Sequence, residues 1–244
     1  MDKYSDLEKI LQKLMSLSIE AGELAKSIKE KKECADEEIE IFIRNNLKDF
    51  NYSFIGEETK PFINQTSNRC FVVDPIDGSL NYQNGDENWC VSISLMENET
   101  PLLGVVFVPE KHMLFYAQKT KGAKIRDCQK HSESSLVIKK KSNLIELLGA
   151  SDNSTKIREI LLNTVLDKNY IRFRHTGSIV VASLKLIMGA RGIIYGGKTH
   201  LHDIAAVWLL VKESGGETFF NRDKGLFIAT QDKETMEKLE RLYL

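Results

Sequence analysis

Apolar residues recur every three or four positions from Leu7 to Ile28, which predicts a long amphipathic helix near the start of the chain. A charged run at 29–33 interrupts this spacing, and a second helical pattern follows up to Leu47. We expect Asp36 to cap the second helix, because its carboxylate can accept hydrogen bonds from free backbone N–H groups. The chain is therefore predicted to begin with two helices.

Short apolar segments rich in β-branched and aromatic residues occupy the middle of the chain and predict strands. These segments are 53–56, 70–73, 89–95, 102–108, 113–117 and 123–125. The third and fourth flank a polar turn with Asn98 and Pro101, which predicts an antiparallel hairpin, and the later ones continue it as a meander. We therefore expect an antiparallel sheet after the two helices.

The pattern changes after about residue 135, where expected strands alternate with expected helices. The strands are 144–148, 170–173 and 192–195, and the helices are 155–166, 178–188 and 203–214. Such alternation favours helices packed against a sheet. The sequence predicts an α+β to α/β layered fold in one compact unit, with halves at 1–135 and 136–244.

Composition narrows the class of protein. Of 244 residues, 42% are hydrophobic and 28% are charged, as in ordinary globular proteins, and the net charge is -1. We therefore do not expect a nucleic-acid partner. Apolar runs end well short of the roughly 18 residues of a membrane span, and the charged N-terminus differs from a signal peptide. Four cysteines without CxxC spacing are typical of reduced thiols in a cytoplasmic protein.

The strongest chemical pattern is the acidic segment Asp74-Pro-Ile-Asp77-Gly78-Ser79, which follows the expected strand 70–73. Carboxylates just past a buried strand are held on a rigid scaffold and are expected to face solvent. Pro75 restricts Asp74 to an extended backbone, and Gly78 allows a sharp turn. Two hard oxygen ligands at this spacing suit Mg²⁺. The alternative is a capped turn in which the aspartates only accept bonds from N–H groups.

Three further segments carry candidate site residues. Adjacent carboxylates in Glu57-Glu58 repel each other, and a cation beside them would remove that repulsion. Asp203 stands at the start of an expected helix, either as its N-cap or as a further metal carboxylate. With His200 and His202 it would fit zinc, but the other acids favour a hard metal. The turn Gly177-Ser178 opens another helix, whose N-terminus can receive an anion.

These segments, with Glu213-Ser-Gly-Gly216, occur in the order and spacing of the inositol monophosphatase family, which the sequence resembles over nearly its whole length. The resemblance implies an alternating α-β-α-β-α sandwich. It also implies a Mg²⁺-dependent, lithium-sensitive phosphomonoesterase, commonly dimeric. Its substrate would be a small phosphorylated metabolite such as a sugar or polyol phosphate.

The resemblance further implies roles for individual residues, with two or three Mg²⁺ ions in each site. The first ion would be held by Glu57, Asp74 and the backbone carbonyl of Ile76, and the second by Asp74, Asp77 and Asp203. Glu57 would also face a third, weaker ion. Asp36 would accept a hydrogen bond from the Ser79 hydroxyl, and the pair would orient the attacking water. Contacts to phosphate and substrate would come from Asp77, Gly78, Ser79, Gly177, Ser178 and Ile179.

The sequence departs from the family pattern at four positions. Ser79 stands where threonine is usual, His202 replaces a tryptophan, Gly196 replaces a substrate-contacting glutamate, and Ile179 replaces an alanine. Two related activities stay open, a 3′,5′-bisphosphate nucleotidase and a fructose-1,6-bisphosphatase-like enzyme. A non-enzymatic alternative is a regulatory or RNA-associated protein that retains the fold.

Overall fold

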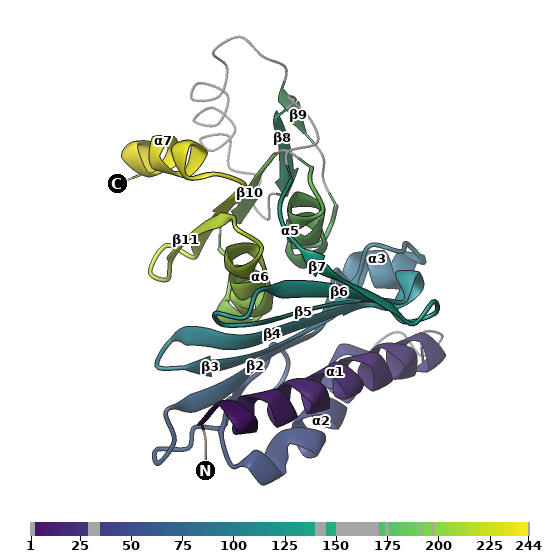
Figure 1. Cartoon of the computed structure of the whole chain (residues 1–244). Helices are drawn as coiled ribbons and strands as arrows, with labels where there is room; N and C mark the ends of the chain where they lie inside the picture. The colour runs from purple at the N-terminus through teal and green to yellow at the C-terminus, as the bar shows by residue number, and fades with distance from the viewer. Residues whose placement is uncertain are drawn as a thin grey trace.

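The computed structural model describes residues 3–28, 35–139, 145–149, 171–173, 176–190, 192–196 and 198–243. Its layers alternate between helices and sheets, beginning with a helix pair and ending, in the part of the chain that the structure describes, with one helix (Figure 1). The predicted α-β-α-β-α sandwich is therefore confirmed. The expected helix at 155–166 lies outside the described residues.

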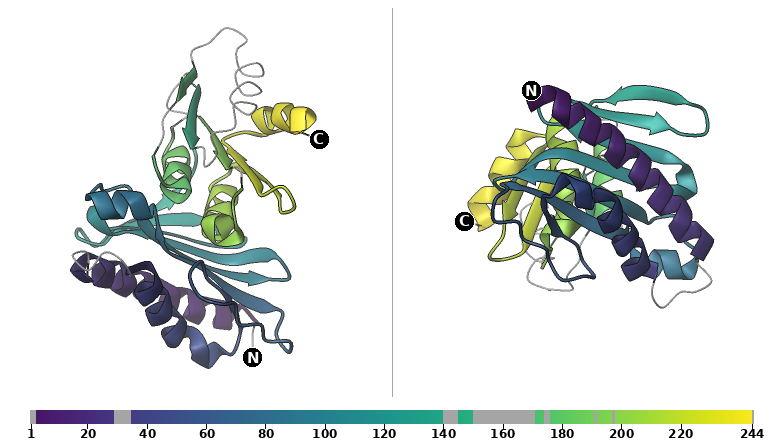
Figure 2. Two further views of the ribbon diagram at one scale, coloured as in Figure 1. Left: turned by 180° about the vertical axis from the view of Figure 1, so that it is seen from behind. Right: turned by 90° about the horizontal axis from the view of Figure 1, so that it is seen from below.

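The first layer contains the two predicted helices, α1 (Lys3–Ile28) and α2 (Ala35–Leu47), and the 3-10 turn η2 (Lys48–Phe50). Seen from below, they cross one face of the first sheet (Figure 2). The apolar stripe of α1 is buried against that sheet, which explains why the helical spacing was visible in the sequence. The capping prediction for Asp36 is wrong, because α2 begins at Ala35 and Asp36 lies within its first turn.

The first sheet has seven strands in sequential order. They are β1 (Ser53–Ile55), β2 (Arg69–Asp77), β3 (Cys90–Glu97), β4 (Thr100–Val108), β5 (Met113–Gln118), β6 (Ala123–Asp127) and β7 (Ser132–Leu136). The hairpin of β3 and β4 and the meander after it are confirmed as antiparallel. The strand β7 was not predicted, and neither was the short helix α3 (Ser79–Asn84) after β2.

One pair of strands corrects the expectation of a wholly antiparallel sheet. β1 runs parallel to β2, with Ile55 opposite Val72. Parallel strands end at the same edge of a sheet. Glu57 therefore emerges beside Asp74, since each lies two residues beyond the paired positions.

The acidic segment also differs from its prediction. β2 continues through Pro75 to Asp77, and its pairing with β3 becomes irregular between Asp74 and Asp77. Both carboxylates are buried rather than facing solvent, with 2% of Asp74 and 8% of Asp77 exposed. The irregular end of β2 therefore places two charged groups inside the protein.

The second sheet lies on the far side of two central helices and has the order β11-β12-β10-β8-β9. Its strands are β8 (Ile145–Gly149), β9 (Ile171–Phe173), β10 (Gly192–Gly196), β11 (Glu217–Asn221) and β12 (Leu226–Thr230). The first three confirm predicted strands and run parallel, whereas β11 and β12 were not predicted. The boundary between the halves at 135 and 136 stays a prediction.

The central helices are α5 (Ile179–Ile187) and α6 (Leu201–Glu213), and α7 (Lys233–Tyr243) covers the outer side of the second sheet (Figure 1). Both central helices were predicted, and α7 was not. Asp203 is the third residue of α6, so its assignment as the N-cap is wrong and His200 occupies that position. Buried residues of α6 and of β4 share the apolar layer between them.

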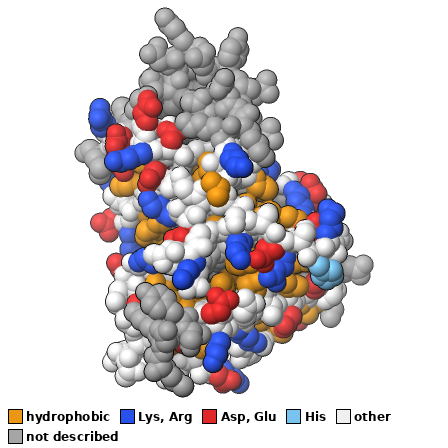
Figure 3. Space-filling model, viewed as in Figure 1, with side chains coloured by type: hydrophobic (Ala, Val, Ile, Leu, Met, Phe, Trp, Pro, Cys, Tyr) orange, Lys and Arg blue, Asp and Glu red, His pale blue; other side chains and the backbone are white. Residues whose placement is uncertain are grey.

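Positive and negative side chains are interspersed over the face shown in Figure 3, in keeping with the small net charge. Within the described part of the chain, every helix is too short or too polar to cross a bilayer. Cys70, Cys90 and Cys128 are free thiols there, whereas Cys34 lies outside the described residues.

Candidate active site

Five chain segments meet where β1 and β2 end. The turn after β1 carries Glu57, the end of β2 carries Asp74 and Asp77, and the first turn of α2 carries Asp36. The starts of α5 and α6 reach the same place from the second half of the chain, because Ser178 bonds to Asp77 and Asp203 repels the neighbouring carboxylates. The site is therefore built from both halves.

Asp74 is the most buried of these acids. Its Oδ1 accepts a hydrogen bond of 3.1 Å from the backbone N–H of Ile76. Burial raises the pKa of the Asp74 carboxyl well above its usual value, and the negative charges of Asp77, Glu57, Asp203 and Asp36 raise it further. A buried carboxyl among four acids is unfavourable unless a positive charge joins the group.

Asp77 is held against the beginning of α5. Its Oδ2 accepts hydrogen bonds from the Ser178 hydroxyl and from the Val180 N–H at 3.1 Å, and the Cys90 thiol lies 3.7 Å away. Burial raises the pKa of Asp77 to about 7, against the lowering effect of the Ser178 bond. Asp77 thus faces the positive end of a helix, but the negative charge of Asp203 still repels its carboxylate.

Glu57 lies at the outer side of the group and is exposed. Desolvation of its carboxyl raises the pKa to about 7, with further contributions from Glu58, Asp203 and Asp36, while a hydrogen bond with Asp74 lowers it. Because water reaches the Glu57 side chain and screens these charges, its shift is a weaker sign of crowding than that of Asp74.

Asp203 is tied to the start of its own helix. Its Oδ2 accepts a bond of 2.6 Å from the N–H of His200, and its Oδ1 lies 3.3 Å from Nε2 of His202. The two histidine rings stack with centroids 5.3 Å apart, and burial lowers the pKa of His202. The histidines therefore pack against each other, which agrees with the preference for a hard-metal site.

The carboxylates are neighbours, but they do not form a ready-made ion cage. Among the described residues, no three Asp, Glu, His or Cys side chains are arranged so that they could hold a metal ion. Oxygens of Asp77 and Asp203 instead accept bonds from protein groups. Side-chain rotation would have to accompany ion binding.

The chemistry of the donor set nevertheless fits Mg²⁺. The neighbouring groups offer carboxylate oxygens, the hard ligands that this ion prefers. The charges with the largest effects on the pKa values of Asp74 and Asp77 all belong to acidic side chains. A divalent cation would supply the missing positive charge.

Ser79 and Asp36 are in contact, although they lie on separate helices. The Ser79 hydroxyl donates to Oδ1 of Asp36 at 2.8 Å, and the carbonyl oxygen of Ile76 is 3.1 Å from the same hydroxyl. Gly78 precedes Ser79 with φ at +92°, a conformation that favours glycine. This turn directs the chain from β2 into α3 at the edge of the acidic group.

The residues before α5 connect the halves. Ser178 caps α5 by accepting a bond of 2.9 Å from the Val181 N–H, while its hydroxyl proton is directed to Asp77. Gly177 is exposed, Ser178 is buried and Ile179 is half-buried. Asn81, which was not predicted, donates to the carbonyl oxygens of Asn88 and Thr176 at 2.6 and 2.7 Å. Asn81 thereby fixes α3 against the approach to α5.

Glu40 is a second residue that the sequence analysis missed. It is completely buried on α2 and accepts hydrogen bonds from the turn that carries Glu57. The signal was available, because Glu40 lies between the core residues Ile39 and Ile43 in the helical pattern. A charge on a buried helix face needs partners, and the backbone N–H groups of Glu58 and Thr59 are such partners.

Comparisons with known proteins agree with the fold. The family model described as "Inositol monophosphatase family" matches residues 5–239. The chain is 34% identical over 197 residues to inositol monophosphatase 2 of Saccharomyces cerevisiae, an alignment that covers 74% of this chain and 66% of that protein. The inositol monophosphatase of Mesembryanthemum crystallinum is 29% identical, with 75% and 70% covered.

Solved structures show the same fold at lower sequence identity. Extragenic suppressor protein suhB from Bartonella henselae has a TM-score of 0.80 and 22% identity, covering 97% of this chain and 100% of that one. Inositol monophosphatase from Anabaena also has a TM-score of 0.80, with 20% identity and 97% of both chains covered. Since the family model spans nearly the whole sequence, the chain belongs to the inositol monophosphatase family.

Proposed function

We propose that this protein is a Mg²⁺-dependent phosphomonoesterase that hydrolyses a small sugar or polyol phosphate with water as the nucleophile. Membership in the family implies a metal-dependent phosphatase. The observation that carries the proposal is the meeting of Glu57, Asp74, Asp77 and Asp203, since burial and neighbouring negative charges raise the pKa values of the first three.

The ligand sets follow the positions of these acids. Glu57, Asp74 and the carbonyl of Ile76 would hold one ion, and Asp74, Asp77 and Asp203 would hold a second. A third, weaker ion would face Glu57. When bound, such ions supply charge neutralisation for a phosphoryl group and make water more acidic.

Ser79 and Asp36 would prepare the nucleophile. Since Oδ1 of Asp36 receives the Ser79 hydroxyl proton, the lone pairs of Ser79 Oγ are left to accept a hydrogen bond from water. As water attacks phosphorus, its proton would pass to Ser79 Oγ and the serine proton to Asp36. The leaving alkoxide takes a proton from solvent.

Binding of substrate would involve both halves. Backbone N–H groups of Gly78 and Ser79 would contact the phosphate, and Gly177 and Ile179 are accessible for the rest of the molecule. Ser178 is buried and its hydroxyl is taken up by Asp77, so its role would be to support Asp77. Gly196 ends β10 and offers no side chain to a hydroxyl group.

The proposal includes a homodimer, as is common in the family, and a cytoplasmic location, which fits the free thiols. The yeast and plant relatives are named inositol monophosphatases, so inositol monophosphate is the first substrate to test. The aligned region spans 66% of the yeast enzyme, and the choice among polyol phosphates stays part of the proposal.

A phosphate-release assay on the purified protein tests the activity. We expect Mg²⁺-dependent release from an inositol, hexose, heptose or glycerol monophosphate, abolished by a chelator, restored by added Mg²⁺ and inhibited by Li⁺. An Asp74→Asn variant purified in parallel controls for contaminating phosphatases.

Two results of the same assay would contradict the proposal. Higher kcat/KM on a 3′,5′-bisphosphate nucleotide or on fructose 1,6-bisphosphate would favour one of the related activities. No release from any substrate, at Mg²⁺ concentrations where calorimetry shows bound ion, would favour a non-enzymatic role.

A further inference from the structure

The turn after β1 is held by a buried acid from a different element. Glu40 of α2 is 0% exposed, and its Oε2 accepts a bond of 2.7 Å from the backbone N–H of Glu58. Its Oε1 accepts from the N–H of Thr59 at 2.9 Å and from the Thr59 hydroxyl. One carboxylate therefore receives three hydrogen bonds from the two residues that follow Glu57.

Gly56 shows how close this contact is. A Cβ atom added to Gly56 would lie 2.2 Å from the carboxyl carbon of Glu40 and 2.3 Å from each of its oxygens. The Glu40 carboxylate thus fills the space that a side chain at position 56 would need. A larger residue at position 56 would therefore have to displace the Glu40 carboxylate.

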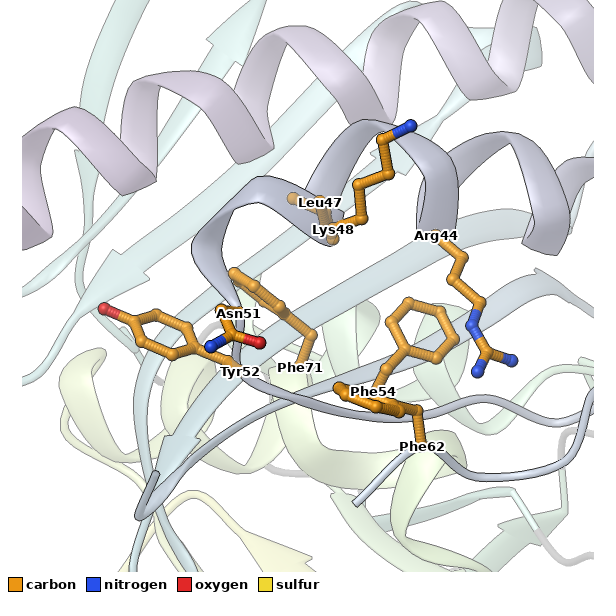
Figure 4. A pocket seen from close by; sticks show the side chains of 8 residues that line it. All are labelled: Arg44, Leu47, Lys48, Asn51, Tyr52, Phe54, Phe62 and Phe71. Atoms are coloured by element: carbon orange, nitrogen blue, oxygen red, sulfur yellow. The ribbon is translucent and has the colours of Figure 1, made fainter. Parts of the chain in front are cut away.

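Arg44 continues the contact one helical turn later. Its Nη1 donates to Oγ1 of Thr59 at 2.9 Å and to the carbonyl of Lys60 at 3.0 Å. The guanidinium lies 5.3 Å from the centre of the Phe54 ring, at the side of a cavity of about 230 Å³ in which aromatic residues make up half of the lining (Figure 4). Residues of α2 therefore bond to the turn from Glu58 to Lys60.

We propose that Glu40 is a positioning residue for metal binding, whose buried carboxylate fixes the turn at 56–60 and thereby keeps Glu57 beside Asp74. Adjacent carboxylates in Glu57 and Glu58 repel each other and the other acids of the site, which favours opening of the turn before an ion binds. Charge-assisted bonds from two backbone N–H groups oppose that opening. The inference rests on the proposed function only in taking Glu57 as a metal ligand.

The direct test is calorimetric titration of Mg²⁺ into the full-length protein without substrate. Glu40→Gln keeps the size of the side chain but replaces one carboxylate oxygen with an NH₂ group. That NH₂ group cannot accept the hydrogen bond that a backbone N–H donates to this oxygen in wild type. We expect the dissociation constant for Mg²⁺ to rise about 10- to 100-fold, as for other residues that orient metal ligands.

Glu37→Gln is the matched control for the loss of one negative charge. Glu37 lies on the same helix, is exposed and acts on the carboxyl of Glu58 through its charge. We expect its Mg²⁺ affinity to change less than threefold, since ~0.6 kcal/mol corresponds to that factor and exposed charges contribute within this range. An equal loss of affinity in both variants would overturn positioning in favour of a charge effect.

Hydrogen exchange of the metal-free protein gives a readout that does not depend on activity. In wild type we expect the amides of Glu58 and Thr59 to be protected, and in Glu40→Gln we expect these two to exchange faster while those of β3 stay protected. In turnover assays, saturating Mg²⁺ should restore most of kcat in Glu40→Gln, so that the defect appears as a higher Mg²⁺ requirement.

If Glu40→Gln does not fold, Thr59→Val is the variant for the same Mg²⁺ titration. It replaces only the hydroxyl that bonds to Glu40 and Arg44. A several-fold weaker Mg²⁺ affinity with an unchanged circular dichroism spectrum would support the inference. Wild-type Mg²⁺ affinity in the folded variants, with unchanged exchange at Glu58 and Thr59, would overturn it. If wild type binds Mg²⁺ and Glu40→Gln weakens binding but no phosphate ester is hydrolysed, the positioning role holds and the proposed function fails.

Discussion

Replacement of Asp77 with asparagine is expected to lower kcat about a thousandfold, because it weakens the metal site that would stabilise the transition state. This factor corresponds to a loss of ~4 kcal/mol of transition-state stabilisation. Asparagine keeps the shape of the side chain, and its one oxygen can still accept from Ser178 and Val180. It removes the negative charge and one oxygen that an ion would need. Steady-state kinetics measure the loss of kcat, and calorimetric titration measures the loss of Mg²⁺ affinity.

The same substitution is expected to leave the fold intact. Burial raises the pKa of Asp77 to about 7, which means that its charged form is unfavourable in the folded protein without metal. The unfolding temperature of Asp77→Asn, measured without Mg²⁺, should therefore be no lower than that of wild type. Asp127→Asn, a substitution at the half-buried end of β6, is the control for a lost carboxylate outside the site. Wild-type kcat in Asp77→Asn would remove Asp77 from the mechanism.

Replacement of Ser79 with alanine is expected to lower kcat by about 10² to 10³, within the range of proton-transfer contributions, with little change in KM. The hydroxyl is bonded to Asp36 at 2.8 Å and would orient water rather than hold the substrate. Mg²⁺ affinity should stay near wild type, because no carboxylate is removed. Kinetics at saturating Mg²⁺ separate kcat from KM.

Two further variants test whether Ser79 and Asp36 act together. Ser79→Thr keeps the hydroxyl and should retain most of the activity. If Asp36→Asn and Ser79→Ala disrupt one proton path, the double variant should be little slower than either single variant. A rise in KM alone for Ser79→Ala would assign the hydroxyl to substrate binding, and additive effects would contradict the shared path.

The acidic segment could be found from the sequence because its residues are close in the chain. Asp74, Asp77, Gly78 and Ser79 follow an apolar strand, and their chemistry is visible without tertiary structure. Their surroundings were not visible. Both aspartates are buried, since β2 continues past Pro75 and α5 covers Asp77, and neither contact is encoded locally.

The missed elements have physical reasons. β7 contains Ser-Glu-Ser-Ser-Leu, a poor strand sequence, and is held as an edge strand by its pairing with β6. Ion pairs from Lys124 and Arg126 to Glu133 join the two strands. The helix α3 is too short for a periodic pattern, and the direction of β1 relative to β2 depends on the chain between them. Contacts made across long sequence separations decided each of these features.

Helix caps were wrong for a related reason. Asp36 and Asp203 stand near helix starts, where an aspartate is a favoured cap. In the structure the Asp36 carboxylate accepts a hydrogen bond from Ser79 instead of capping α2. Asp203 is the third residue of α6 and lies inside the helix rather than at its cap. The Asp36 carboxylate thus contacts Ser79 at the site, whereas the Asp203 carboxylate bonds to the start of its own helix and acts on Asp74 and Asp77 through its charge.

The most direct measurement is the anomalous scattering of crystals grown with Mn²⁺ in place of Mg²⁺. We expect anomalous peaks within coordination distance of carboxylate oxygens from Glu57, Asp74, Asp77 and Asp203, with the last two side chains rotated to reach them. Mn²⁺ bound elsewhere, or these four carboxylates without an ion in a protein that still hydrolyses phosphate esters, would contradict the shared metal site.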